Sequence, residues 1–187
     1  MKTIIVCLNF ALMIQMAYAQ KEISGVIPAK TITVANQQLT FNGAGLREKY
    51  FLDLYVGSLY VSTKSNDANK VMKANESMAI IIDIVSGLVS SEKMITAINE
   101  GFEKSTNGNT ALFKDRIESF KAAFKEEITE GDHFVIAYIK GSGTEIHKNG
   151  KKIKTIEGLD FKQALFGIWL CNNPADESLK EGMLGLN

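Results

Sequence analysis

From residue 23 onward, hydrophobic and polar positions alternate in short patterns typical of strands and helices. Two β-type runs, 31–34 and 38–41, flank a turn at Asn36-Gln37. Asn42-Gly43-Ala44-Gly45 then interrupts the pattern. The long aromatic and aliphatic run 47–61 predicts a single strand. Residues 78–85 are nearly continuously apolar and β-branched, which predicts a strand covered on both faces.

Helical spacing appears in the middle of the chain. Residues 66–74 predict a short helix, and 92–104 place Ile95, Ile98 and Phe102 three and four positions apart. Residues 111–128 predict a further helix, whose apolar stripe consists of Leu112, Phe113, Ile117, Phe120, Phe124 and Ile128. We expect both stripes to make core contacts.

The last third predicts one strand, one hairpin and two helices. The strand covers 133–139, and the hairpin covers 144–156 around Asn149-Gly150, a pair that tolerates the positive φ of a type I′ turn. The helices cover 161–170 and 175–184, with Pro174 at the start of the second. The order of elements predicts one α+β domain over 20–187, a large antiparallel sheet with a layer of helices on one face.

The first nineteen residues have the features of a signal peptide. Lys2 precedes an apolar run from Ile4 to Met16, and Ala17-Tyr18-Ala19 forms a small-residue cleavage site. The run is shorter than the ~20 apolar residues of a membrane anchor, the alternative interpretation. We therefore expect export to a periplasm or the exterior, no membrane span after cleavage, and Cys171 as the only remaining cysteine.

Composition excludes several functions. The 187 residues carry 21 basic and 21 acidic side chains without a basic stripe, so we expect no nucleic-acid partner. His133, His147 and Cys171 match no zinc spacing, and we expect neither a metal nor a cofactor. No Gly-x-Ser-x-Gly elbow and no phosphate-binding glycine motif are present.

Arg47 is unusual by its type. Only Arg47 and Arg116 among the 21 basic residues are arginines, and Arg116 lies beside Asp115 on an amphipathic, solvated helix. Arg47 follows the glycines, where the aromatic run begins. Its planar fork suits a carboxylate or enolate oxygen better than a lysine does. A structural ion pair is the alternative role.

These residues resemble a known family. Two stretches are similar to the signature of chalcone-isomerase-like proteins, especially that of their exported bacterial branch. They are Asn42 to Arg47 (Asn-Gly-Ala-Gly-Leu-Arg) and 55–61 (Tyr-Val-Gly-Ser-Leu-Tyr-Val). The stretch 168–176, from Ile168 to Asp176, is similar to that branch's closing helices. The resemblance covers nearly all of the chain after the signal peptide, and it implies a ligand cleft between sheet and helices.

The resemblance also implies which positions would be catalytic. In the plant isomerases, an arginine in this motif stabilises an enolate, and a threonine, a tyrosine and an asparagine complete the site. Arg47 matches the arginine, and Tyr55 takes the threonine position. Met94 and Gly101 stand where the tyrosine and asparagine belong, and neither can orient water through a side-chain hydrogen bond. We therefore expect no catalytic residues and no isomerase activity.

A non-catalytic branch of the same fold binds fatty acids through the motif arginine and a strand tyrosine. By this resemblance Arg47 and Tyr55 would hold a ligand carboxylate, both facing one side of a single strand because they are eight residues apart. Tyr60 is the second choice of tyrosine. The predicted apolar lining is Phe51, Leu59, Met94 and Ile98.

Three hypotheses follow. The first is a non-catalytic exported protein that binds a fatty acid or similar small amphipathic acid. The second is an intramolecular lyase or isomerase that uses Arg47 and Tyr55. The third is a ligand-free scaffold that docks a protein partner. The sequence specifies neither the ligand nor the oligomeric state.

Overall fold

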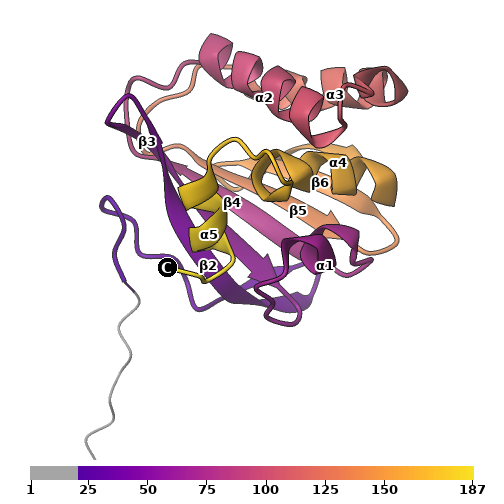
Figure 1. Cartoon of the computed structure of the whole chain (residues 1–187), viewed down its shortest axis with the longest axis horizontal. Helices are drawn as coiled ribbons and strands as arrows, with labels where there is room; N and C mark the ends of the chain where they lie inside the picture. The colour runs from indigo at the N-terminus through magenta and orange to yellow at the C-terminus, as the bar shows by residue number, and fades with distance from the viewer. Residues whose placement is uncertain (1–20) are drawn as a thin grey trace, which may run out of the picture.

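The computed structural model describes residues 21–187, so the predicted signal peptide lies outside the described residues. Seven antiparallel strands form one sheet in which each strand pairs with its neighbour in the chain (Figure 1). They are β1 Thr31–Val34, β2 Gln37–Lys49, β3 Leu52–Val61, β4 Met78–Ile84, β5 His133–Ile139, β6 Gly143–Lys148 and β7 Lys151–Ile156.

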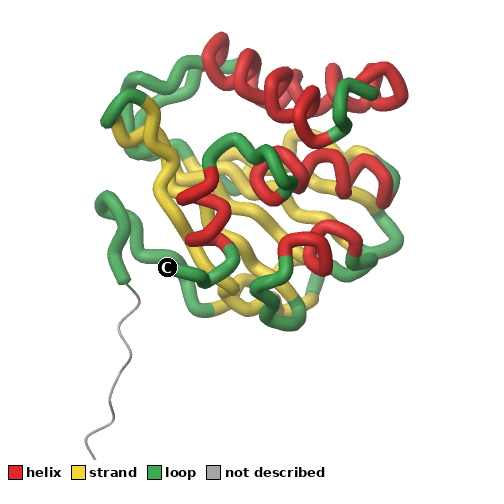
Figure 2. Tube along the Cα trace, in the orientation of Figure 1, coloured by secondary structure: helices red, strands yellow, loops and turns green. Residues whose placement is uncertain are grey.

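Helices cover one face of this sheet (Figure 2). They are α1 Ala68–Lys73, α2 Ser91–Ser105, α3 Lys114–Lys121, α4 Leu159–Leu170 and α5 Glu177–Met183, with the 3₁₀ turns η1 Thr110–Phe113 and η2 Ala122–Phe124 on either side of α3. The predicted α+β architecture is thereby confirmed. Within residues 21–187, every helix falls short of the length and apolarity that crossing a membrane requires.

The predicted single strand over 47–61 is wrong. β2 and β3 form a hairpin, in which Lys49 pairs with Leu52 and the two-residue loop consists of Tyr50 and Phe51. Both loop residues have positive φ, 53° and 63°, as a type I′ turn requires. The pattern gave no turn signal because this turn normally uses Asn and Gly, and here two aromatic residues adopt it.

The glycines at 43 and 45 belong to the interior of β2 rather than to a loop, which corrects the interpretation of residues 42–45 as a break. Their role is to admit α5. A Cβ added at Gly43 would lie 2.2 Å from the carbonyl oxygen of Gly182, and one added at Gly182 would lie 2.5 Å from that of Ala44. Asn42 completes the contact by donating from Nδ2 to the carbonyl of Met183 at 2.9 Å.

The predicted helix over 111–128 is also wrong in part. It divides into η1, α3 and η2, and Leu112 is 76% exposed instead of lying on the core stripe. Arg116 on α3 forms a bidentate pair with Asp160 at the start of α4, at 2.8 and 2.7 Å. The Arg116 hydrogen bonds hold the pKa of Asp160 below its usual value. Arg116 thus joins two helices, in addition to facing solvent.

The main core lies between the sheet and the helix layer and includes nearly all of α4. A smaller cluster lies on the opposite face of the sheet. It consists of Leu39, Tyr60, Ala79, Ile81 and Ala137.

A buried lysine stabilises the end of α1. Lys162 on α4 is fully buried, and its Nζ donates to the carbonyls of Val71, Met72 and Ala74, each at 2.9 Å. These carbonyls lie at the helix C-terminus, where no intrahelical donor remains. Burial lowers the pKa of Lys162 to about 8, so the ammonium form prevails at neutral pH and supplies all three protons.

The first prediction concerns the approach of α5 to β2. Gly43→Ala should lower the free energy of unfolding by about 2–3 kcal/mol, because the new methyl group meets backbone atoms that cannot move independently. Denaturant unfolding measures the change. Gly87→Ala is the matched control, since nothing lies within 4 Å of a Cβ added there. Equal stability of the two variants would contradict this packing.

The second prediction concerns Lys162. Lys162→Met keeps the apolar stem but leaves three buried carbonyls without a donor, so we expect a loss of about 2–3 kcal/mol in unfolding free energy. Lys154→Met, at an exposed position of β7, should change stability by less than about 0.5 kcal/mol. A Lys162→Met protein as stable as the wild type would show that the three hydrogen bonds contribute nothing net.

Candidate functional site

A cavity of about 390 Å³ lies between the end of the β2–β3 hairpin and α2. Its buried interior is mainly apolar and comes from β3, α2, α4 and the loop between β4 and α2. The buried lining residues are Tyr55, Val89, Met94, Ile98, Gly101, Ile168 and Trp169. Cavities of this size and character are typical of small-molecule sites.

Arg47 and Tyr55 meet in this cavity because of the hairpin. Arg47 on β2 is the direct cross-strand partner of Tyr55 on β3, so both side chains lie on the helix-facing side of the sheet. The prediction that the two residues share one face is therefore confirmed by the pairing, but its stated reason, a single strand, is wrong.

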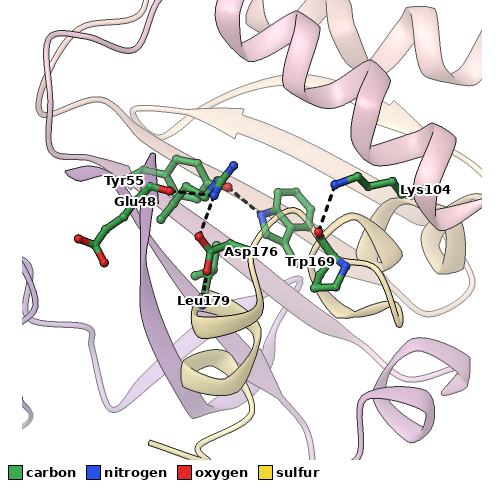
Figure 3. A network of polar contacts seen from close by, with 8 residues as sticks. Glu48, Tyr55, Lys104, Trp169, Asp176 and Leu179 are labelled. Atoms are coloured by element: carbon green, nitrogen blue, oxygen red, sulfur yellow. Dashed lines mark hydrogen bonds and ion pairs between the residues drawn. The ribbon is translucent and has the colours of Figure 1, made fainter. Parts of the chain in front are cut away.

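Two hydrogen bonds fix the guanidinium of Arg47. Its Nη1 donates to Asp176 Oδ2 at 2.7 Å and to the carbonyl of Glu48 at 2.9 Å. Asp176 is also the N-cap of α5, where its Oδ1 accepts from the backbone N–H of Leu179 (Figure 3). Among the described residues, Nε and Nη2 of Arg47 have no hydrogen-bond partner. Three of the five N–H donors thus remain for a second acceptor.

Tyr55 is oriented by Trp169. The indole Nε1–H donates to the Tyr55 hydroxyl oxygen at 3.1 Å (Figure 3). Because the oxygen accepts this bond, the hydroxyl proton can be donated elsewhere, and within residues 21–187 it has no acceptor. Burial raises the pKa of Tyr55, so the hydroxyl stays a neutral donor through the physiological pH range.

Three lysines add positive charge to the cavity lining. Lys49 comes from β2, and Lys93 and Lys104 come from α2, against a single lining carboxylate, Glu100. Because Arg47 is already paired with Asp176, it is the charge of these lysines that favours an anion in the cavity. The arrangement is one of fixed donors, apolar walls and excess positive charge, which suits an acid with an apolar body.

The predicted lining residues divide into two groups. Met94 and Ile98 line the cavity with Arg47 and Tyr55. Tyr60, the second choice of tyrosine, does not, because the strand alternation places it on the opposite face, where its hydroxyl donates to the carbonyl of Ala29 at 3.0 Å. Leu59 packs in the core outside the cavity lining, and Phe51 is at the hairpin tip, fully exposed.

Met94 and Gly101 both face the cavity, as the comparison with the isomerase positions assumed. Gly101 allows α2 to pack closely on α4, since an added Cβ would lie 2.7 Å from Cγ2 of Ile168. The site therefore has no room for a larger side chain at Gly101 unless Ile168 moves.

The two histidines lie outside this cavity, in the sheet. His133 Nδ1 lies 2.6 Å from Asp83 Oδ1, and His147 Nε2 lies 3.1 Å from Glu145 Oε2. The hydrogen bond to Asp83 raises the pKa of His133. Within residues 21–187, no group of three or more His, Cys, Asp and Glu side chains is placed to hold a metal ion.

The fold and site define an α+β protein with an antiparallel sheet, a helix layer on one face and a mainly apolar cavity between them. The chain belongs to the chalcone isomerase-like family, whose model matches residues 20–185. Among solved structures, it is similar to a fatty-acid binding protein of Arabidopsis thaliana, with a TM-score of 0.69 and 16% identity over 88% of this chain and 94% of that one. That likeness confirms the fold. A search of curated proteins finds no match.

Sequence reasoning missed two residues that organise the site. Trp169 and Asp176 both belong to the stretch 168–176 used for the resemblance, yet neither was identified as a site residue. The chain has a single tryptophan, and Asp176 lies in the first turn of the helix predicted over 175–184, so an N-cap was a detectable signal. Their contacts with Tyr55 and Arg47 span more than 100 positions and are not visible locally.

The third prediction separates the two roles of Asp176. Asp176→Asn keeps an oxygen for the N-cap but removes the charge beside Arg47, so we expect a loss of about 1 kcal/mol in unfolding free energy. Asp176→Ala removes both and should lose about 2 kcal/mol. Denaturant unfolding distinguishes them. Asp67→Ala, the N-cap of α1, provides a capping-only control of about 1 kcal/mol. Equal losses in Asp176→Asn and Asp176→Ala would exclude an independent capping role.

Proposed function

We propose that this protein is a non-catalytic binding protein that holds a fatty acid or similar small amphipathic acid in the cavity between the β2–β3 hairpin and α2. The observation that carries the proposal is the pair of Arg47 and Tyr55, which present unused donors at one apolar cavity. A buried carboxylate needs both a charge partner and hydrogen bonds, and this pair can supply them.

Asp176 leaves room for the ligand carboxylate at Arg47. Only Nη1 contacts Asp176, so Nε and Nη2 can form a second, bidentate pair without breaking the first. The Tyr55 hydroxyl, held by Trp169, would donate to the same carboxylate. The apolar chain would then lie along Met94 and Ile98. The fatty-acid binding relative of the same fold supports the ligand class.

The lack of catalysis is part of this proposal. Gly101 has no side chain and little space for one, and Met94 can orient no water, so the two positions that hold a tyrosine and an asparagine in isomerases offer no polar group. A lyase or isomerase reaction of that type would have Arg47 and Tyr55 without either of the two water-orienting side chains. No lining residue specifically favours it.

Export is the second part of the proposal. The pattern from Lys2 to Ala19 supports cleavage before Gln20, and we infer that the chain belongs to the exported bacterial branch of the family and acts in a periplasm or outside the cell. The family model begins at residue 20, which is compatible with a leader before it.

The fourth prediction tests the ligand class. Arg47→Gln should weaken palmitate binding at least tenfold, because a buried carboxylate loses its only guanidinium partner. Titration calorimetry on residues 20–187 measures this, since that range contains the whole described core. Arg116→Gln is the matched control, because Arg116 pairs with Asp160 rather than lining the cavity.

Hexadecanol provides a ligand control, because it has the same chain without the carboxylate. We expect its affinity to be the same in wild type and Arg47→Gln. Palmitate binding that is absent in the wild type, or unchanged in a folded Arg47→Gln protein, would refute the proposal. Native mass spectrometry of the protein purified from its own host would then identify any other bound molecule.

A further inference from the structure

We infer that the tip of the β2–β3 hairpin and the adjacent β4–α2 loop form a membrane-docking surface, which seats the mouth of the cavity on a phospholipid bilayer. We call it the mouth surface; it consists of Lys49, Tyr50, Phe51 and Leu52 of the hairpin, Leu88 of the loop, and Lys93 in the first turn of α2. The inference deepens the proposed function and rests on it in one respect: a fatty acid or similar amphipathic ligand would pass between the cavity and a bilayer at this place.

The apolar part of the mouth surface is unusually exposed. Phe51 is completely exposed, Tyr50 is 83% exposed, and Leu52 and Leu88 are 48% and 46% exposed. Large apolar side chains gathered at one projecting point mark an interaction site. The hairpin shape favours insertion between lipid headgroups over docking on a flat protein face, because Tyr50 and Phe51 form the turn beyond the last strand pair, Lys49 with Leu52.

The backbone at this tip is strained in order to carry aromatic residues. Tyr50 and Phe51 both have positive φ, which is unfavourable for any residue with a Cβ and is normally assigned to Asn and Gly. Tyr50 lines the cavity. Phe51 is fully exposed and makes no core contact that would offset the strain. A tip selected only for stability would use other residues.

Two cations flank the apolar tip on the cavity side. Lys49 Nζ lies 5.7 Å from the centroid of the Tyr50 ring, and Lys93 Nζ donates to the carbonyl of Leu88 at 2.9 Å. Ammonium groups beside inserted aromatic rings suit the phosphates of lipid headgroups. The nearby carboxylates of Glu48 and Asp53 belong to a cross-strand pair on the other face of the hairpin, where Asp53 accepts from Ser24.

The mouth surface is continuous with the cavity. All its members except Phe51 also line the cavity, whose lining also includes the buried residues Tyr55, Met94, Ile98 and Trp169. A bilayer in contact with this surface would therefore face the open side of the cavity. An apolar ligand could pass between the two without crossing water, which is costly for its chain.

The fifth prediction uses a substitution that should not impair folding. Tyr50→Asn combined with Phe51→Gly places the preferred type I′ pair at the turn, so the melting temperature should be equal to or higher than that of the wild type. Binding of residues 20–187 to vesicles of phosphatidylcholine and phosphatidylglycerol, measured by co-sedimentation without added fatty acid, should fall about tenfold or more. Phe51→Gly alone changes no residue of the cavity lining, so it should retain palmitate binding from solution while weakening vesicle binding.

Matched controls isolate each contribution. Leu112→Ser removes an exposed leucine away from the cavity and should leave vesicle binding unchanged. Combining Lys49→Gln and Lys93→Gln should weaken binding to the mixed vesicles more than binding to pure phosphatidylcholine. Combining Lys151→Gln and Lys154→Gln on the edge strand β7 should leave binding to both kinds of vesicle unchanged.

The outcomes distinguish this inference from the proposed function. Wild-type protein that does not bind the mixed vesicles, or a Tyr50→Asn/Phe51→Gly protein that binds them as well as the wild type, would overturn the docking surface even if palmitate binds. Vesicle binding that depends on the tip while palmitate does not bind would keep the docking surface and refute the ligand class.

Discussion

The contact between the backbones of β2 and α5 is the constraint on which the site depends. At Gly43, Gly45 and Gly182 an added Cβ would meet backbone atoms of the other element within 3 Å, and Asn42 donates to the carbonyl of Met183 that ends the helix. This close approach brings Asp176, at the N-terminus of α5, to within 2.7 Å of Arg47. The glycine motif thus acts in packing, and through packing it orients the arginine of the site.

The site couples two pairs of residues from distant parts of the chain. The hairpin places Arg47 beside Tyr55, and the C-terminal helices supply Asp176 and Trp169, one partner for each. Each partner engages one side of its residue and leaves donors toward the cavity. Polar groups that are held in this way lose little entropy when they bind a ligand, so the site is preorganised.

Much of the fold was predictable because its signals are local. Asn149-Gly150 identified its hairpin, with φ values of 51° and 79°, and the spacing of Ile98 and Phe102 identified α2. The β2–β3 hairpin was missed because Tyr50 and Phe51 have no local preference for a turn. The helix over 111–128 was overextended because periodicity does not show where 3₁₀ turns replace α-helix. Arg47 and Tyr55 were found through the family motif, whereas their partners depend on tertiary contacts.

The meander of the sheet has a consequence for the order of assembly. Every strand pairs with its neighbour in the chain, and four of the six connections are turns of two or three residues, whose closure is entropically inexpensive; the β3–β4 and β4–β5 connections are longer and contain α1, α2 and α3. The Arg47–Asp176 contact instead joins residues 129 positions apart, and Asn42–Met183 joins residues 141 apart. We expect the sheet to form first and the cleft to be completed last, when the C-terminus docks. The protein would then bind its ligand only after the whole chain has been synthesised and its C-terminus has docked.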